Sequence, residues 1–406
     1  MVTKEKKLTP WIKKRHMVVR NLLYWPLYLY TVLRYRIEIQ RLPKDQAQPC
    51  FVLFNHQTAF DQFFVSFTFP QHVYYVASED LFAKGWLSRL ITWLVAPIPF
   101  RKSTADITAI KNLLRIAREG GTVAMAPEGN RTYSGTTEYM KSSVASLVKR
   151  LRLPLVLYRI EGGYGVHPRW SDVIRKGKMR SYISRTIQPE EYKEMSDAEL
   201  FEIIRQELYV DDRNMEFHYD SRRKAEYLDR AMYVCPFCGL SEFYSKGDII
   251  SCKSCGRQIR YLPNLELLGI GFDFPYRNVK QWYDAQCDFI RNLDLQPYQE
   301  KPIYADTVRY SRDLYCEKKV LLDKRATLMI FADRFVVKTN GGEDIYPFSE
   351  MIGATVLGKN KLNLYLDGLT YQFKGDKHFN ALKYLNLYCY ACNVAKGDPQ
   401  NEFLGL

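Results

Sequence analysis

Short apolar runs alternate with amphipathic stretches between residues 35 and 187. Runs rich in β-branched and aromatic residues predict four strands, at Phe51–Phe54, Val73–Ala77, Thr122–Ala126 and Pro154–Ile160. Between these runs apolar residues recur at helical spacing, which predicts helices near 60–69, 79–94, 103–119 and 141–152. Strands that alternate with helices are typical of α/β proteins, so we expect a three-layer αβα domain over residues 35–210.

The pattern changes after this domain. The charge-mixed stretch that follows is interpreted as helical, so we expect residues 211–232 to be a helical connector. Residues 233–262 hold a compact cysteine module, and residues 263–304, rich in Pro, Tyr and Asp, form a connector of unclear fold. Over 305–396, short alternating strands with Gly- and Asn-containing turns precede one helix, which predicts a small C-terminal β-barrel capped by a helix.

The N-terminus combines positive charge with an apolar, aromatic run. Basic residues at positions 4, 6, 7, 13, 14 and 15 precede the run Met17–Leu33, and no small-residue cleavage site follows it, so we expect it to be retained. The run would reach about 26 Å as a helix, against about 30 Å of hydrocarbon in a bilayer, and Arg20 and Pro26 interrupt it. We interpret residues 1–34 as an amphipathic segment that contacts the membrane surface; the alternative is a buried helix of a soluble domain.

Charge supports the membrane interpretation. The chain has 406 residues with a net charge of +14, and its 47% hydrophobic content excludes a disordered basic tail. Residues 1–40 contain nine Lys or Arg and two acidic residues, so about half of the excess lies in a tenth of the sequence. This placement favours an anionic membrane surface over nucleic acid as the partner, and predicts a membrane-associated protein at the cytoplasmic face.

The most informative stretch follows the predicted strand Phe51–Phe54. It reads Asn-His-Gln-Thr-Ala-Phe-Asp over residues 55–61. If His56 lies on the turn and Asp61 in the first turn of the next helix, the carboxylate can bind one imidazole nitrogen. The other nitrogen can then take a proton from a substrate hydroxyl. A His near an Asp is more often structural, so further residues must support this interpretation.

That support comes from a second stretch, Pro-Glu-Gly-Asn-Arg-Thr over residues 127–132, which also follows a predicted strand. Gly129 permits close backbone approach, and Arg131 offers a planar donor fork for a phosphate. Glu128 could accept from a hydroxyl or hold an arginine. Arg101, which ends a short apolar run, is a second candidate for phosphate. The structural alternatives are a solvated Arg101 and a helix-capping Thr132.

These residues carry a resemblance to the glycerolipid acyltransferase superfamily, which includes the 1-acylglycerol-3-phosphate and other lysophospholipid acyltransferases. The Asn-His-x-x-x-x-Asp block is matched by Asn55, His56 and Asp61, and the Pro-Glu-Gly-Thr-Arg-Ser block by Pro127, Glu128, Gly129, Arg131 and Thr132. Arg101 aligns with the acceptor-phosphate arginine of a weaker block. Asn130 stands where Thr is usual and Thr132 where Ser is usual.

The resemblance implies acyl transfer from a thioester, either acyl-coenzyme A or acyl carrier protein, to a lysophospholipid hydroxyl. His56 would be the general base and Asp61 would orient it. Arg101 and Arg131 would hold the phosphate, while Glu128, Gly129 and Thr132 would shape the acceptor site. The chain contains no Gly-x-Ser-x-Gly sequence, which argues against a serine-esterase mechanism. The other function that fits is an inactive membrane adaptor that keeps the lipid-binding fold.

Four of the nine cysteines form two matched pairs. The pairs read Cys235-Pro-Phe-Cys238-Gly and Cys252-Lys-Ser-Cys255-Gly, with thirteen residues between Cys238 and Cys252. This spacing predicts a closed, structural four-thiolate Zn²⁺ site and resembles a zinc ribbon. The intervening loop is not basic, so nucleic acid is not the expected partner. Residues 305–396 resemble a PH/GRAM-type domain, in their strand pattern alone.

Overall fold

The computed structural model describes residues 9–82, 85–100, 107–214, 217–313 and 319–403. Arg101, the first of the two arginines expected at a substrate phosphate, lies outside the described residues, as do the basic positions Lys4, Lys6 and Lys7. The first three α-helices of the described chain are α1 (Lys14–Tyr35), α2 (Asp61–Thr68) and α3 (Trp86–Val95). None of the described helices has both the length and the apolarity needed to cross a bilayer.

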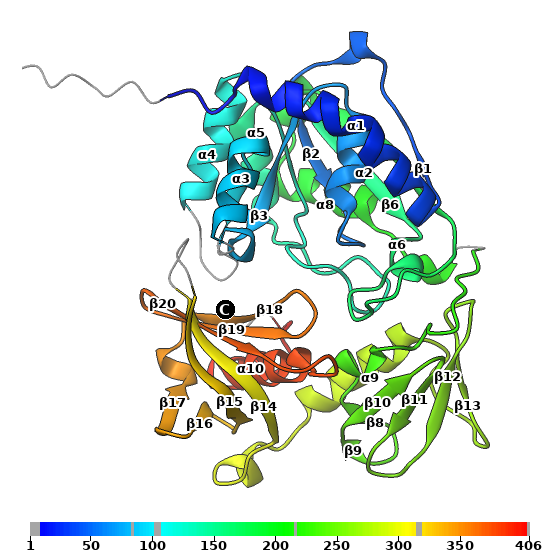
Figure 1. The fold of residues 1–406 in the computed structure, drawn as a ribbon, viewed down its shortest axis with the longest axis vertical. Coiled ribbons are helices and arrows are strands. Elements are labelled where there is room, and N and C mark those ends of the chain that lie inside the picture. Colours follow the sequence, from blue (N-terminus) through cyan, green and yellow to red (C-terminus); the bar gives the residue numbers. More distant parts are fainter. Residues whose placement is uncertain (1–8, 83–84, 101–106, 215–216, 314–318, 404–406) are drawn as a thin grey trace, which may run out of the picture.

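A seven-stranded sheet organises the N-terminal domain (Figure 1). Its strands run in the order β1-β7-β6-β2-β5-β3-β4, with β6, β2, β5, β3 and β4 parallel and β7 antiparallel to β6. The bounds are β1 Ile37–Ile39, β2 Phe51–Phe54, β3 Val73–Ser78, β4 Ile98–Phe100, β5 Thr122–Met125, β6 Leu155–Glu161 and β7 Met179–Ile187. The four strands predicted from the sequence are all present, with ends shifted by one residue at most.

Helices cover both faces of this sheet, as expected for an αβα domain. The side chains of β2 alternate, so that Phe51 and Leu53 join one buried cluster and Val52 and Phe54 the other. The first cluster lies under α4 (Ile107–Arg118), α5 (Ser143–Leu151) and α8 (Asp197–Leu208), and the second lies under α2. The short helices α6 (Gly163–Val166) and α7 (Pro189–Lys193) complete the domain.

The connector at 211–232 differs from its expected helical form. Its described residues contain only two 3-10 turns, η3 (Asp212–Asn214) and η4 (Leu228–Arg230), and no α-helix. Long-range polar contacts replace helical hydrogen bonds here. The carboxylate of Asp212 accepts from the backbone N–H groups of Gly162 and Tyr164, at 2.8 Å each, and thereby caps α6. These tertiary bonds hold the connector against the N-terminal domain.

The cysteine module is larger than its spacing suggested. Its two-stranded ribbon, β8 (Val234–Cys235) and β9 (Gly239–Leu240), lies beside a four-stranded sheet of β10 (Phe243–Lys246), β11 (Ile249–Cys252), β12 (Gln258–Tyr261) and β13 (Leu267–Gly269). The segment of previously unclear fold, 263–304, therefore supplies β13. It also supplies α9 (Val279–Arg291), whose Trp282 Nε1 donates to the Val234 carbonyl at 2.9 Å.

The C-terminal domain is an antiparallel seven-stranded sheet in the order β17-β16-β15-β14-β20-β19-β18. Its bounds are β14 Tyr304–Asp313, β15 Val320–Ile330, β16 Arg334–Thr339, β17 Gly342–Pro347, β18 Gly353–Leu357, β19 Lys361–Leu366, β20 Leu369–Lys374 and α10 Ala381–Ala395. The sheet is a curled half-barrel and not the closed barrel that we expected. Helix α10 occupies the open side, where Tyr384 and Tyr388 pack against Phe335. The Cys389 and Cys392 pair lies on this helix, with Cys389 buried in the core.

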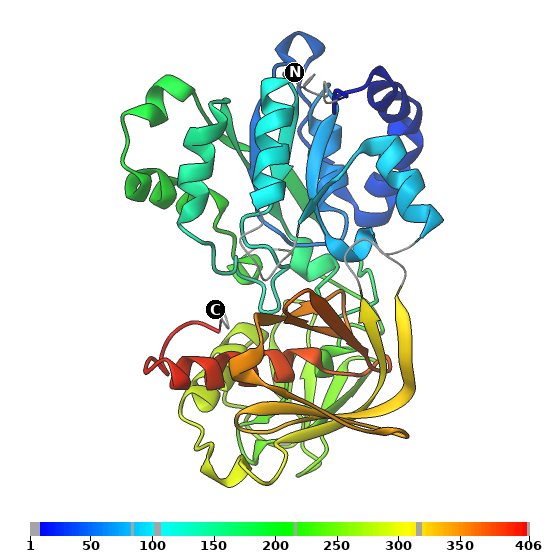
Figure 2. The ribbon, with the colours of Figure 1, turned by 90° about the vertical axis from the view of Figure 1, so that its left-hand side faces the viewer.

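The C-terminal sheet lies against the carboxyl edge of the N-terminal sheet, as two perpendicular views show (Figures 1 and 2). Glu79, directly after β3, accepts hydrogen bonds from Tyr365 and Asn363 of β19. Arg169 donates to the Val356 carbonyl of β18 at 3.0 Å. Because α/β proteins place their sites at the carboxyl ends of parallel strands, β18 and β19 form the wall opposite the expected site.

Candidate active site

Two neighbouring parallel strands bring the predicted blocks together. Strands β2 and β5 are paired in register, with Phe51 opposite Val123 and Leu53 opposite Met125. The segment that follows β2 carries His56, and the segment that follows β5 carries Glu128 and Arg131. Blocks that are 72 residues apart in sequence therefore leave the same edge of the sheet side by side.

His56 and Asp61 form the expected pair. His56 Nδ1 lies 2.8 Å from Asp61 Oδ2; the histidine side chain is 26% exposed and the aspartate 0%. Asp61 is the first residue of α2, so the intervening turn lets the carboxylate reach back to the imidazole. Because Nδ1 is bound to Asp61, Nε2 is the ring nitrogen that can exchange a proton with a substrate.

The Asp61 carboxylate is itself held in place by the turn that it closes. It accepts from the backbone N–H of Gln57 at 2.7 Å and from the backbone N–H and hydroxyl of Thr58 at 2.9 and 2.7 Å. These donors fix the orientation of the carboxylate before any substrate binds, which is what a group that orients a general base requires.

The loop at 127–132 clamps the backbone of His56 on both sides. The His56 N–H donates to Glu128 Oε1 at 2.7 Å, and the His56 carbonyl accepts from the Thr132 N–H at 3.3 Å. The second oxygen of Glu128 accepts from the Glu138 N–H at 2.7 Å. Desolvation by burial raises the pKa of Glu128 well above its ordinary value, and the negative charges of Glu138 and Asp61 add to that rise. The two backbone N–H donors oppose it. Both oxygens of Glu128 are thus engaged inside the protein.

The residues on either side of His56 anchor it to β6 and α6. Asn55 exchanges two hydrogen bonds of 2.8 Å with the backbone of Ile160, and Gln57 Oε1 accepts from the Tyr164 N–H at 2.9 Å. Asn55 belongs to the block recognised in the sequence. Nothing in the sequence indicated that Gln57 would bind the backbone of α6, because its partner Tyr164 lies 107 residues away.

The three remaining predicted residues occupy different environments. Gly129 has φ +66° and no atom within 4 Å of the position that a Cβ would take, so it borders open space. Arg131 Nη1 is buried without a hydrogen-bond partner in the described part of the chain. The Thr132 hydroxyl accepts from the N–H groups of Ser134 and Gly135, which stabilises the loop. Gly129 therefore borders open space, and Arg131 keeps a buried donor that no described residue uses.

A second arginine, Arg169, lies beside Arg131 and was not predicted. Its Nη1 donates to the Arg131 carbonyl at 3.1 Å, and its guanidinium lies over the Tyr133 ring at 4.3 Å. Burial, together with the positive charge of Arg169, lowers the pKa of Arg131 to about 10, so Arg131 remains a cation at neutral pH. A buried cation with an unused donor next to a second cation is a favourable place for an anion.

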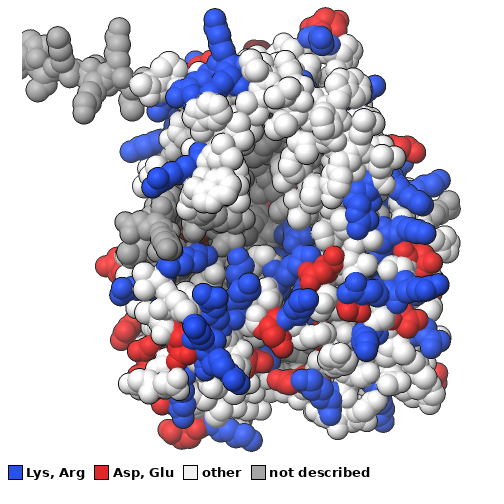
Figure 3. All heavy atoms as spheres, in the orientation of Figure 1, with Lys and Arg blue, Asp and Glu red and all other residues white. Residues whose placement is uncertain are grey.

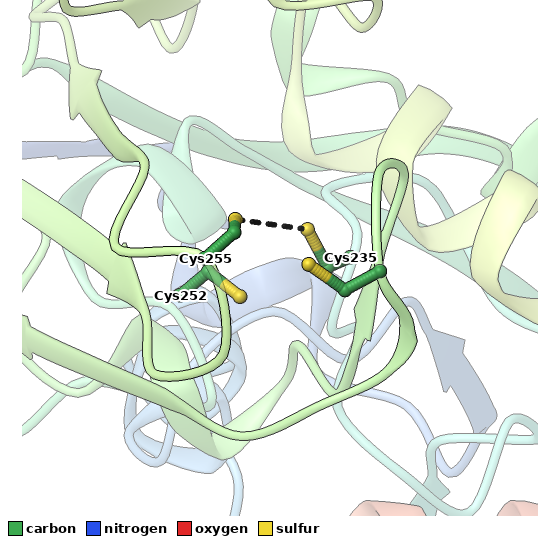
Figure 4. Close-up of side chains that lie close together, drawn as sticks. Cys235, Cys252 and Cys255 are labelled. Carbon is green, nitrogen blue, oxygen red and sulfur yellow. Dashed lines mark hydrogen bonds between the residues drawn. The ribbon is translucent and has the colours of Figure 1, made fainter.

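The cysteines form a cluster that can hold a metal ion. The sulfur atoms of Cys235, Cys238, Cys252 and Cys255 all lie within 4.8 Å of one another, and those of Cys235 and Cys255 are 3.9 Å apart. In Figure 4, Cys235 approaches from the side opposite to Cys252 and Cys255. A tetrahedron with Zn–S distances of about 2.3 Å has edges of about 3.8 Å, so the donor set and its spacing fit Zn²⁺. Gly239 and Gly256, one residue after each pair, have φ +73°.

Two comparisons with known proteins returned matches. Residues 35–161, about a third of the chain, match the family model described as Acyltransferase. The match includes the His–Asp pair and the loop at 127–132. No curated protein matches the chain. One similar solved structure is the 1-acyl-sn-glycerophosphate (LPA) acyltransferase PlsC from Thermotoga maritima, which is 17% identical with a TM-score of 0.40 and covers 50% of this chain and 80% of that chain.

Proposed function

We propose that the protein is a membrane-associated O-acyltransferase. It moves a fatty acyl group from a thioester, acyl-coenzyme A or acyl carrier protein, to the hydroxyl of a lysophospholipid. The acceptor that best fits the site is 1-acylglycerol-3-phosphate, which gives phosphatidate. The observation that carries the proposal is the 2.8 Å His56–Asp61 pair, held beside Arg131 at the edge of an acyltransferase domain.

The reaction needs one proton to move twice. His56 Nε2 removes the proton from the acceptor hydroxyl as its oxygen attacks the thioester carbonyl, and Asp61 stabilises the imidazolium that forms. The tetrahedral intermediate then collapses, the C–S bond breaks, and the departing sulfur takes the proton from His56. The ester and the free thiol are the products, so no acyl-enzyme is required.

Arg131 fits the role of holding the acceptor phosphate. Its buried, unpartnered Nη1 can donate to a phosphate oxygen, and its charge favours an anion. We assign Arg101 to the same phosphate because the resemblance implies that role for the arginine that follows Phe100 in the sequence. Glu128 and Thr132 shape this acceptor site indirectly, through the backbone of His56, and Gly129 leaves room beside it.

An apolar surface on α1 and α3 supports membrane contact. The two helices pack together, and both present large apolar side chains to solvent, including Leu22, Leu33 and Trp86, which are 74–77% exposed. Figure 3 shows a largely uncharged surface over the upper part of the molecule, where these helices lie. Contiguous apolar surface of this kind marks an interaction site, and the basic N-terminus suits an anionic, cytoplasmic-face membrane.

We assign the cysteine cluster to structural Zn²⁺. The four thiolates leave no open coordination position, so the ion would cross-link the two knuckles and take no part in acyl transfer. The module docks on α9, and α9 packs against α10, so metal binding would stabilise the attachment of the C-terminal domain. We retain the PH/GRAM-type assignment for residues 305–396, as a domain that anchors the enzyme.

The direct test is to offer the purified full chain a panel of lysophospholipids with acyl-coenzyme A or acyl carrier protein, and to weigh the products. The proposal expects a mass gain of one acyl group on an acceptor that carries a phosphomonoester, and none with the His56→Ala variant. Failure of every donor and acceptor, with a folded and zinc-loaded protein, would favour the adaptor alternative.

A further inference from the structure

A cavity of about 340 Å³ lies where three parts of the chain meet. The N-terminal domain contributes Asp172, from the loop after α6, and η4 contributes Arg230. The C-terminal domain contributes Lys359 and Asn360, from the turn between β18 and β19, and Lys374–Lys377, from the end of β20 and the turn that follows it. None of the described residues assigned above to acyl transfer lines this cavity.

One buried arginine ties the walls of the cavity together. Arg230 is 2% exposed, and its two terminal nitrogens each donate to the Asp172 carboxylate at 3.1 Å. Its Nη1 also donates to the Trp170 carbonyl at 2.9 Å, and its Nε to the Lys377 carbonyl at 2.6 Å. Because one rigid guanidinium bonds to both domains, the cavity is preformed and a ligand need not assemble it.

The lining carries more positive than negative charge. Four cations, Arg230, Lys359, Lys374 and Lys377, face two acids, Asp172 and Asp376. The Asp172 carboxylate forms ion pairs with Arg230 and with Lys359, whose Nζ lies 2.8 Å from Oδ1. The ammonium groups of Lys374 and Lys377 have no acidic partner within 4.0 Å among the residues that the structure describes. The cavity is thus built with two cations available to a ligand.

The sheet beside the cavity adds an unusual row of cations. Lys374 on β20 is in register with Arg309 on β14 and with Lys361 on β19, so three basic side chains stand across three adjacent strands. Lys361 makes a further interaction of its own, so the like-charged pair of Arg309 and Lys374 is the part of this row that an anionic ligand would stabilise. Figure 3 shows Lys and Arg gathered over the upper end of this sheet, below the hollow between the two domains.

We propose that this cavity binds the phosphate of an organic phosphate, with Lys374 and Lys377 as its donors and Arg309 extending the positive surface. Lysine ammonium groups act as point charges, so the site would accept a phosphomonoester or a diphosphate in several orientations. Two sources have this chemistry: the nucleotide part of coenzyme A and a phospholipid headgroup. The site does not depend on His56, and its phosphate binding does not require the proposed acyl transfer to be correct.

The test compares two double variants of the full chain that lose the same charge. Lys374→Gln/Lys377→Gln removes the proposed donors, and Lys324→Gln/Lys338→Gln removes two exposed lysines elsewhere on the same sheet. One arm titrates adenosine 3′,5′-bisphosphate, the nucleotide end of coenzyme A, by calorimetry. The other arm measures sedimentation with phosphatidylcholine vesicles that contain or lack phosphatidate.

The proposal expects the first variant to lose about tenfold or more in affinity in at least one arm, while the control binds as the wild type does. Loss in the nucleotide arm identifies coenzyme A as the source, and loss in the vesicle arm identifies a lipid headgroup. The proposal is overturned if the wild type binds neither probe, if Lys374→Gln/Lys377→Gln binds normally in both arms, or if the control loses as much. His56→Ala should bind both probes normally even if it abolishes transfer, which separates failure here from failure of the enzyme proposal.

Discussion

The backbone N–H of His56 donates to the carboxylate of Glu128 at 2.7 Å, across 72 residues of sequence. Glu128 in turn accepts from the Glu138 N–H, so one carboxylate joins the loop after β2 to the loop after β5. The histidine is therefore positioned through its main chain by Glu128 and through its ring by Asp61. This arrangement fixes the orientation of His56, as the proposed role of general base requires.

Glu128→Gln should lower kcat with little change in KM for either substrate. The amide has only one oxygen, so it can accept from His56 or from Glu138 but not from both, and the base loses its fixed position. We expect a loss of about tenfold to a hundredfold, measured by steady-state kinetics. Glu202→Gln, a half-exposed position on α8, is the matched control. A variant with normal kcat would show that the clamp is dispensable.

Arg131→Lys should weaken acceptor binding. The substitution keeps the positive charge but removes the planar donor fork and the buried Nη1, so KM for the lysophospholipid should rise about tenfold, while KM for the acyl donor stays the same. Arg118→Lys, on the exposed end of α4, supplies the control. Equal KM values for the acceptor in Arg131→Lys and the wild type would remove Arg131 from the phosphate site.

The stability of the protein should fall with acid partly through His167. Burial lowers the pKa of this histidine to about 3, with Lys359 and Arg131 adding to the effect, against about 6.5 in the unfolded chain. Because the folded state binds the proton more weakly than the unfolded chain does, acid favours unfolding. The contribution of His167 to the free energy of unfolding is therefore complete above pH 6.5 and is lost as pH falls toward 3. Between pH 6.5 and pH 4 the loss should be about 3 kcal/mol.

Urea unfolding from pH 7 to pH 4 measures this loss. His167→Gln removes the titrating group, so its free energy of unfolding should fall less steeply with acid than that of the wild type. The exposed His218→Gln should show the wild-type slope. Parallel slopes for all three proteins would exclude His167 as a source of acid sensitivity.

Removing the cysteine ligands should abolish metal binding and destabilise the C-terminal half. We expect one Zn²⁺ per wild-type chain and none in Cys235→Ser/Cys252→Ser, with a lower Tm, because structural zinc contributes directly to folding. Cys392→Ser, on α10, should keep both the metal and the Tm. Wild-type protein that contains no zinc and whose four thiols are freely alkylated would contradict the assignment.

The sequence predicted the features that depend on local pattern and on block order. The strands of the N-terminal sheet, the αβα layers and the approach of His56 to Asp61 and to the loop at 127–132 all follow from apolar periodicity and from two short blocks placed after strands. The curled sheet with its terminal helix was also expected, although as a closed barrel. Each of these features depends on a local pattern or on a block that directly follows a strand, and the parallel pairing of the strands then brings the blocks together.

What the sequence could not predict depends on contacts between distant segments. Arg169 lies in a loop with no pattern of its own, and only the fold places it beside Arg131. The connector at 211–232 looked helical because it is charged, but the side chain of Asp212 caps α6 instead. The contact of Tyr365 with Glu79 joins residues 286 positions apart, so no sequence pattern showed that β18 and β19 cover the carboxyl edge of the N-terminal sheet.

The central claim is that His56 is the base of an acyl transfer, and His56→Ala tests it most directly. With 1-acylglycerol-3-phosphate and acyl-coenzyme A or acyl carrier protein, the variant should lose at least about a hundredfold in kcat, while its circular dichroism spectrum and Tm match those of the wild type. His218→Ala, at an exposed position, should keep full activity. A folded His56→Ala protein that transfers acyl groups at the wild-type rate would contradict the account.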